Sequence, residues 1–439
     1  MYILTGASGS GKTELLINLL KEKDLNIEKA PKYASREKRN SNDDINHADD
    51  IEVGKYDVVY NLNKERYGII FSEIDKLIEE GKNVFIILSY IRVVKELKER
   101  FQNKVTVIYI SSAIDVERLK KIQFDRYKAS FKPDEEQTRR LELQFKRLKS
   151  ATNIAKWDSL FECMNELNED WKTVLPMFES TEVRASKIRD FHKTYLDNIH
   201  VFDHVILNYK IDTGDIKGFD MVRQARNIIA CYNKPEESKK SKSKPVIFVL
   251  AAASGTGKGI LMETLNICIG KDKIHVVTKQ AKREAKKNDK RDGLVAIGRN
   301  GIFSSEFDIK WTFHNDDIFQ GTEYAISSEE VKRNTDSATP QIVVSNMRQF
   351  GMFREKYQNR IVFLYLHALR SKEDVEAYQY ANNPTKEEAE SRISEIENMY
   401  AQYIERISEF DHVLLNTAYP EDLYEQIFTL IEFYNLNHK

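Results

Sequence analysis

The apolar residues of this 439-residue chain gather in short continuous runs, and the same order of runs recurs in the two halves of the sequence. In the first half, the runs at 83–88 and 104–110 predict buried strands, and a helical pattern at 71–80 precedes them. The runs at 341–344 and 360–366 repeat this order in the second half. Continuous apolar runs that alternate with helical patterns are typical of a parallel sheet covered by helices on both faces. We therefore expect an α/β fold.

The two halves also begin and end alike. Residues 2–12 and 246–258 each read as a buried strand that leads into a glycine-rich loop and a lysine. Near the ends, 202–208 and 410–416 share the pattern Phe-Asp-His-Val-x-Leu-Asn, and each is followed by a last helical pattern. A shared beginning and a shared end predict a tandem duplication of one architecture.

Composition places the boundaries between the halves. The stretch 233–245 is rich in Lys, Ser and Pro and has no large apolar residue that could hold it in a core, so it is predicted to be a linker. The predicted domains are 1–232 and 246–439. The first is expected to carry a helical insert near 133–178 that acts as a lid or docks a protein partner.

Charge and cysteine content narrow the classes of partner. The formal net charge of −1 argues against a general attraction to nucleic acid or to a membrane surface. Cys163, Cys231 and Cys268 lie far apart and show no zinc-ligand spacing, which fits a reducing compartment. The chain starts directly on a predicted strand and not on a leader, so we expect a cytoplasmic protein.

A phosphate-binding loop is the clearest chemical signal. The segment Gly6-Ala-Ser-Gly-Ser-Gly-Lys-Thr13 fits the pattern Gly-x4-Gly-Lys-Thr between a predicted strand and a predicted helix. Glycines let consecutive backbone N–H groups turn toward phosphate, Lys12 would neutralise the β and γ phosphates, and the hydroxyl of Thr13 would hold Mg²⁺. The residues predicted to bind ATP are Gly6, Ser8, Gly9, Ser10, Gly11, Lys12 and Thr13.

The corresponding loop of the second half is incomplete. Gly255, Gly257 and Lys258 remain, but Ala252 replaces the first glycine and Gly259 stands where the magnesium-binding hydroxyl belongs. This loop is interpreted either as a catalytic site, with Gly255, Gly257 and Lys258 as its nucleotide-binding residues, or as a relic kept for its fold, and we expect it to bind Mg-ATP weakly or not at all.

The pattern Gly-x-Ser-Gly-x-Gly-Lys resembles the phosphate loop of guanylate kinases and of the related ribose bisphosphate phosphokinases of the phosphonate pathway. The resemblance implies two P-loop kinase-like domains, each with a parallel sheet flanked by helices. Ala34-Ser-Arg-Glu-Lys-Arg39 resembles the segment of that family whose arginines bind the acceptor phosphate, and Tyr67-Gly68 resembles its Tyr-Gly motif. By this resemblance the residues that bind the acceptor are Ser35, Arg36, Arg39 and Tyr67, and the lid arginines that stabilise the transferring phosphoryl group are Arg118 and Arg184.

The second half keeps part of this set. Its residues at the equivalent positions are Arg283, Lys286, Gln320, Gly321, Ala377 and Arg392. The basic segment 279–291 is open to two readings, an anion-binding site or a solvated loop. Trp311 is predicted to belong to the core.

Two features depart from the family pattern. The acidic residue expected after the strand that follows the Tyr-Gly helix is absent at 88–90 and at 344–346. No base-reading glutamate stands between Arg39 and Tyr67, where Asp43 and Asp44 are the candidates to replace it. A site without base-reading groups predicts little preference for GMP.

These features predict an ATP-dependent kinase, with Mg²⁺ as cofactor, that acts in its first half on a nucleoside monophosphate or another small phosphorylated molecule. One alternative is a nucleotide-binding interaction protein that reports occupancy to a partner through the insert. Another is a kinase or ATPase that acts on nucleic-acid ends, which draws on the segment 279–291 but is opposed by the net charge.

Overall fold

The computed structural model describes most of both halves. The described residues are 1–7, 9–36, 44–62, 65–112, 165, 193–208, 219–232, 246–253, 255–265, 267, 273–285, 289, 293–303, 306–312, 322–337, 339–369, 372–382, 385–417 and 419–437. The predicted linker at 233–245 lies outside them, as does the predicted insert at 133–178 apart from residue 165.

The core of the first half is a five-stranded sheet in the order β2-β7-β1-β8-β9, and every neighbouring pair in it is parallel. Its strands are β1 (Tyr2–Thr5), β2 (Ile27–Lys29), β7 (Asn83–Ile87), β8 (Thr106–Ser111) and β9 (His204–Leu207). The central strand β1 is buried along its whole length, as its unbroken apolar run predicts.

The second half contains a sheet with the corresponding order, β11-β16-β10-β17-β18, again parallel throughout. Its strands are β10 (Ile247–Ala251), β11 (His275–Val276), β16 (Gln341–Val344), β17 (Ile361–Ala368) and β18 (His412–Asn416). The prediction of an α/β fold with parallel sheets is confirmed.

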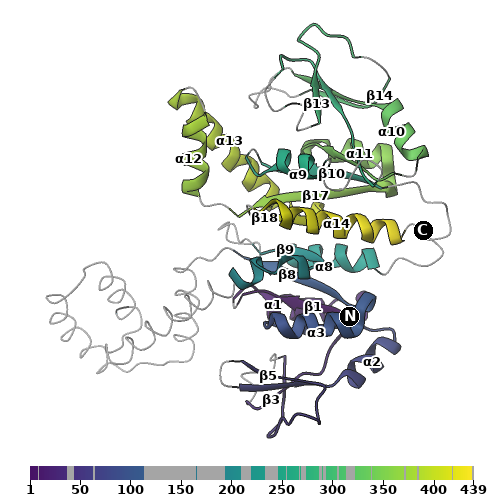
Figure 1. Ribbon diagram of the computed structural model, residues 1–439, viewed down its shortest axis with the longest axis vertical. Helices are drawn as coiled ribbons and strands as arrows, with labels where there is room; N and C mark the ends of the chain where they lie inside the picture. Colours follow the sequence, from purple (N-terminus) through teal and green to yellow (C-terminus); the bar gives the residue numbers. More distant parts are fainter. Residues whose placement is uncertain are drawn as a thin grey trace, which may run out of the picture. The chain divides into compact units, whose positions relative to one another are not determined.

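Helices pack against the core sheets through apolar stripes on the helix surfaces. In the first half, α1 (Lys12–Leu19) and α8 (Phe219–Tyr232) pack Leu15, Leu19 and Ile228 against β1, β7 and β8. The helices α2 (Phe71–Glu79) and α3 (Ile91–Phe101), both labelled in Figure 1, precede β7 and β8 along the chain. Each fully buried leucine contributes about 1.5–3 kcal/mol relative to exposure, so this packing is a main source of stability.

The second half is covered in the same way. Here α9 (Lys258–Thr264) and α14 (Pro420–Asn437) pack Leu261, Ile427 and Ile431 into a core with β10, β16 and β17. The other helices are α10 (Ser328–Asp336), α11 (Phe350–Tyr357), α12 (Lys372–Asn382) and α13 (Lys386–Glu405). The hydroxyl of Thr385 caps α13 by accepting from the backbone N–H of Glu388 at 3.2 Å. None of the described helices is both long enough and apolar enough to cross a bilayer.

Each half adds a four-stranded sheet with mixed strand directions. In the first half its order is β4-β3-β6-β5, with β3 (Tyr33–Ala34), β4 (Asn46–His47), β5 (Val58–Leu62) and β6 (Glu65–Ile69). In the second half the order is β13-β12-β15-β14, with β12 (Lys279–Ala281), β13 (Leu294–Ala296), β14 (Phe307–Thr312) and β15 (Glu323–Ser327). In both, the first strand pair is parallel and the other two are antiparallel.

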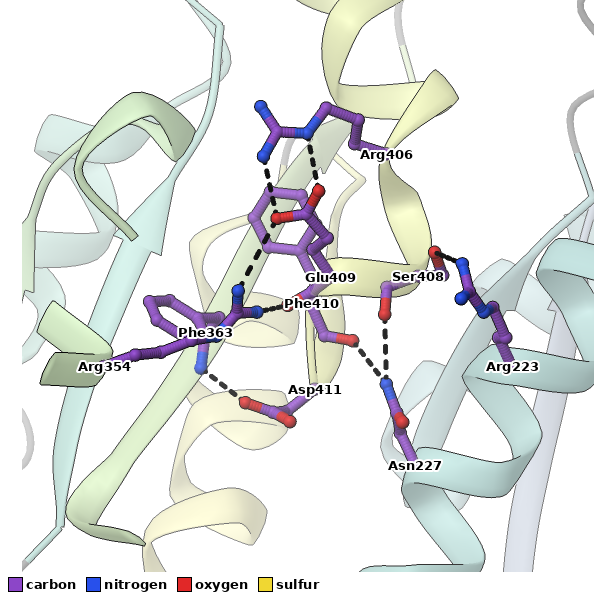
Figure 2. Close-up of polar contacts among 9 residues, drawn as sticks. All are labelled: Arg223, Asn227, Arg354, Phe363, Arg406, Ser408, Glu409, Phe410 and Asp411. Carbon is purple, nitrogen blue, oxygen red and sulfur yellow. Dashed lines mark hydrogen bonds and ion pairs between the residues drawn. The ribbon is translucent and has the colours of Figure 1, made fainter. Parts of the chain in front are cut away.

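Both core sheets belong to one compact unit, Met1–Thr5, Gly11–Ser111 and Asn198–Lys439, whereas Gly6–Ser10 and Ser112–Asp197 form a second unit. Within the first unit, β9 and β18 are the last strands of their sheets, and they contact each other. Asn227 of α8 donates to the backbone oxygens of Ser408 and Phe410 at 3.3 and 3.2 Å (Figure 2). The predicted domain boundaries at 232 and 246 stay a prediction.

The shared pattern Phe-Asp-His-Val-x-Leu-Asn has matching structural roles in the two halves. Asp203 accepts from the backbone N–H of Val107, and Asp411 accepts from that of Phe363, both at 2.7 Å. Each aspartate therefore fixes the last strand against its neighbour. His204 lies where β9 contacts β18, and it is four residues from the asparagine that ends the pattern.

Candidate functional site

The glycine loop of the first half leads from β1 into α1. Gly9 and Gly11 have φ of 86° and 94°, in the left-handed region that favours glycine. Gly11 is also the residue before the helix, so the first N–H groups of α1 follow it directly. Ser8 lies outside the described residues, and Ser10 is buried. This backbone is of the kind that a phosphate-binding loop needs.

The side chain of Asn208 lies behind the loop and leaves no room for a larger residue at Gly11. A Cβ placed on Gly11 would lie 2.6 Å from Nδ2 of Asn208 and 3.1 Å from Cε of Met221. The equivalent Gly257 faces Asn416, whose side chain donates to the backbone oxygen of Thr256 at 2.7 Å. The asparagine of the repeated pattern thus lies against the glycine loop in each half.

Lys12 is the first residue of α1 and is buried with two other charged groups near it. Burial lowers the pKa of Lys12 to about 8; the negative charge of Asp44 partly offsets this, and the positive charge of Lys32 adds to it. Lys32, only 6% exposed, forms an ion pair with Asp44 and donates to the backbone oxygen of Ile87 at 2.9 Å. Lys12 and Lys32 therefore both lie near the carboxylate of Asp44, next to the loop.

Lys32 is not among the residues predicted from the sequence. It lies one residue before β3 in no recognisable motif, and a lone lysine is usually solvent-exposed. Asp44, a candidate to replace the base-reading glutamate, is paired with Lys32 in the structure. Asp43 lies outside the described residues.

The predicted acceptor residues Arg36 and Tyr67 come together. Nε of Arg36 donates to the hydroxyl of Tyr67 at 3.4 Å. Ser35 holds β3 to β6 at this point, because its hydroxyl accepts from the backbone N–H of Arg66 at 3.0 Å. Arg39, Arg118 and Arg184 lie outside the described residues, so their predicted roles stay predictions.

Tyrosine rings continue from Tyr67 along one side of the site. Tyr67 stacks on Tyr60 with ring centroids 5.2 Å apart, and Tyr60 stacks on Tyr90 at 6.2 Å. Burial raises the pKa of Tyr60, and the nearby Tyr67 and Asp44 raise it further, so Asp44 lies near both the tyrosines and Lys12. The residue after Tyr67 must be small, because a Cβ on Gly68 would lie 2.5 Å from Tyr56.

The equivalent groups of the second half are engaged differently. Nζ of Lys258 donates to the backbone oxygens of Ala252 and Ala253 at 3.0 and 2.7 Å, within its own loop. Arg283 forms a two-pronged ion pair with Asp289 at 2.6 and 2.8 Å. Gly255 and Gly257 keep left-handed φ values of 77° and 98°. The loop geometry is retained, while the cations contact protein oxygens.

The remaining predicted positions of the second half are only partly described. Arg392 lies on α13 and pairs with Glu395 at 3.4 Å, and Ala377 lies on α12. Lys286, Gln320 and Gly321 lie outside the described residues. Trp311 is buried and stacks on Tyr324 at 5.5 Å, which confirms its prediction as a core residue.

Comparison with known proteins gives a limited result. No family model matches the chain, and no curated protein matches it. Among solved structures, the chain is similar to guanylate kinase from Anaplasma phagocytophilum, with 18% identity and a TM-score of 0.29 over 44% of this chain and 88% of that one. The architecture described above rests on the strand order and not on this likeness.

Proposed function

We propose that the chain is an ATP-dependent phosphotransferase whose first half transfers a phosphoryl group to a nucleoside monophosphate or a phosphorylated sugar. The geometry of the first glycine loop carries the proposal. Gly9 and Gly11 have left-handed φ values just before α1, whose first residue Lys12 is buried near Lys32 and Asp44. In the same half Arg36 contacts the hydroxyl of Tyr67, and a guanidinium with a phenol suits a phosphate group.

The chemistry requires positioning more than proton transfer. An oxygen of the acceptor phosphate forms a new bond to the γ-phosphorus as the bond from that phosphorus to the ADP oxygen breaks. An acceptor phosphate is already ionised, so no general base is needed. Lys12 would stabilise the charge on the transferring group, and Arg36 and Tyr67 would orient the acceptor.

Magnesium would supply charge neutralisation at the β and γ phosphates. Thr13 fits this role because it follows Lys12 in the first turn of α1 and its side chain is exposed. Gly259 occupies the same place in the second half and has no side-chain oxygen.

Phosphorylated product should be sought directly, by mass spectrometry, from the full chain with Mg-ATP and a panel of nucleoside and sugar monophosphates. Lys12→Ala should slow transfer by on the order of a hundredfold or more, and Lys258→Ala should have little effect. Equal losses in the two variants would contradict the assignment to the first half. We expect no strong preference for GMP, since Asp44, one of the two candidates to read its base, is paired with Lys32.

The alternative of a nucleotide-binding interaction protein makes a different prediction. The absence of an acidic residue at 88–90 favours it. It predicts tight Mg-ATP binding that Lys12→Ala weakens, with no phosphorylated product from any member of the panel.

A further inference from the structure

One buried lysine lies where the chain of the first half passes from its core sheet to its small sheet, the four-stranded sheet β4-β3-β6-β5. The backbone N–H of Ala30 still donates to a core strand, at the oxygen of Phe85 in β7 (2.8 Å). The backbone oxygen of Lys32 already accepts from the N–H of Asn46 in β4 at 2.7 Å. Lys32 therefore marks the joint between the two sheets.

The ammonium of Lys32 is bonded to both sides of this joint. It donates to the backbone oxygen of Ile87, the last residue of β7, at 2.9 Å. It also forms an ion pair with Asp44, which lies two residues before β4. An ammonium has three donors, so it can bind oxygens that lie in different directions. Lys32 thus ties the segment that leads into β4 to the end of a core strand.

The small sheet carries the residues predicted to bind the acceptor. Tyr67 lies on β6 opposite Ala34 of β3, and Arg36 follows β3 and contacts the hydroxyl of Tyr67. The ring of His47 on β4 lies 3.1 Å from the backbone oxygen of Arg36. The placement of β3 and β4 on the core sheet therefore decides where Arg36 and Tyr67 lie relative to Lys12.

The second half has a buried lysine at the same place. Residues 32–36 and 279–283 share the pattern Lys-x-Ala-x-Arg. Lys279 is the first residue of β12, the strand that corresponds to β3, and it is 8% exposed. A lysine buried at this point in both halves indicates a role in the joint between a core sheet and a small sheet, which both halves possess.

Stability alone does not account for a buried ion pair. Removing two charges from water costs about as much as their attraction returns, and an apolar pair of similar volume is often at least as stable. The pair adds direction, because the ammonium of Lys32 must meet both the carboxylate of Asp44 and the oxygen of Ile87. A small sheet displaced from this placement would leave a buried charge without its partner, which is costly.

We propose that Lys32 is a positioning residue, which fixes the small sheet of the first half at the end of β7 and so sets where Arg36 and Tyr67 lie. Its effect on phosphoryl transfer rests on the proposed function. The attachment of the small sheet does not, so the two are tested separately.

Hydrogen exchange of the full chain, followed by mass spectrometry, tests the attachment without any substrate. Lys32→Met removes the charge and keeps most of the length of the side chain. We expect the amides of 44–62 to exchange at least about tenfold faster in this variant, because the small sheet opens more often when its link to the core is lost. The amides of the core strand at 83–87 should change less.

Two controls accompany this variant. Lys279→Met removes the equivalent buried lysine, so it should speed exchange in the second half, at 294–296, and leave 44–62 as in the parent chain. Lys55→Met removes an exposed lysine that pairs with Glu52 at 2.9 Å on the same segment. This exposed pair contributes little, so its loss should change exchange in neither half.

Steady-state transfer tests the positioning. At pH 7, below the pKa of Lys12 of about 8, Lys12 carries its charge. Lys32→Met should then raise the KM of the acceptor by about tenfold and leave the KM of ATP unchanged, because only the acceptor residues are displaced. In the double variant Lys32→Met/Asp44→Leu, an apolar pair should restore the melting temperature but not the KM of the acceptor, which separates position from stability.

Unchanged exchange at 44–62 in Lys32→Met would overturn the proposal, whether or not the chain transfers phosphate. If the parent chain does transfer phosphate, two further results would overturn the positioning role and leave the proposed function intact. One is an acceptor KM that Lys32→Met does not alter, and the other is an acceptor KM that the double variant restores together with the melting temperature. A parent chain that forms no product would overturn the proposed function, and exchange alone would then decide whether Lys32 fixes the small sheet.

Discussion

Nδ1 of His204 lies 3.0 Å from Nδ1 of His412, so one hydrogen bond joins the last strands of the two core sheets. The other ring nitrogens lie 2.7 Å from the hydroxyls of Tyr232 and Tyr434. The four side chains come from equivalent positions in the two halves and form a continuous chain of hydrogen bonds, in which Tyr232 is half-buried and the other three are buried.

This arrangement predicts a pH-dependent stability. Burial lowers the pKa of His204 well below its usual value, and the neighbouring His412 and Lys98 lower it further. Below about pH 6.5 the unfolded chain binds a proton at this residue that the folded chain does not, so the free energy of unfolding falls by roughly 1.4 kcal/mol per pH unit. The stability that the neutral His204 provides is fully present above that pH. Urea unfolding between pH 5 and 8 measures it.

The variant His204→Gln should be less stable near pH 7, by about 1–3 kcal/mol, and its stability should fall less steeply toward acid pH. His200→Gln is the control, because His200 is exposed in the adjacent turn. Parallel pH profiles for the parent chain and His204→Gln would show that His204 does not titrate as expected.

Lys12 predicts a pH dependence of ATP binding in the alkaline range. The pKa of Lys12 is about 8 in the folded chain, so its positive charge is present below that pH and is lost as the pH rises through it. Affinity for ATP should fall over the same interval. Asp44→Asn should move the midpoint to lower pH, because the carboxylate that favours the charged lysine is gone.

Calorimetric titration with ATP at several pH values checks this prediction. Asp49→Asn is a matched control, since Asp49 lies on the same segment and its side chain is 99% exposed. A midpoint that stays in place, or rises, in Asp44→Asn would mean that Asp44 does not act on Lys12.

Arg36 and Arg283 predict opposite effects in the two halves. Arg36→Ala should raise the KM of every accepted substrate by roughly tenfold or more, because a charge-assisted contact to phosphate is lost. Arg283→Ala should leave transfer unchanged and lower stability by about 1–3 kcal/mol, since Asp289 would lose its partner in a site where both side chains are 13% exposed. Steady-state kinetics and thermal unfolding of the two variants are sufficient. A change in KM in Arg283→Ala would contradict this prediction, because it would show that Arg283 takes part in transfer.

Replacing Gly11 with alanine should lower stability by more than backbone strain alone accounts for, because the added methyl group meets a neighbouring side chain. Gly11→Ala adds a methyl group against Asn208 and also strains a φ of 94°, whereas Gly54→Ala strains a similar φ of 102° with no atom within 4 Å. The loss of stability should therefore be larger for Gly11→Ala, and Asn208→Ala should recover part of the difference. Equal melting temperatures for the two alanine variants would rule out the contact.

The strands of the two core sheets could be predicted from the sequence because their apolar runs are continuous. The runs at 83–88 and 341–344 became β7 and β16, because strands covered on both faces of a sheet read as continuous apolar runs. The turn of the first glycine loop was predictable because glycine is favoured where φ is positive, at Gly9 and Gly11.

The charged surroundings of the loop were not predictable. Lys32 and Asp44 are twelve residues apart with no helical or strand spacing between them, and only the folded chain pairs them beside Lys12. The pairing of Arg283 with Asp289 was not predicted for the same reason. The charge pattern of a segment shows how many charges it carries, but it does not show which two side chains form an ion pair.

The contact between β9 and β18 bears on how the chain is made. His204 and His412 are 208 residues apart, so at roughly 5–20 residues per second the ribosome needs about 10–40 s to supply the second strand after the first. During that interval the surface of β9 that contacts β18 in the finished chain has no neighbour, and transiently exposed surface of this kind favours association with other chains. Nascent chains of this protein should therefore depend on chaperones most strongly between completion of the first half and release of the C-terminus.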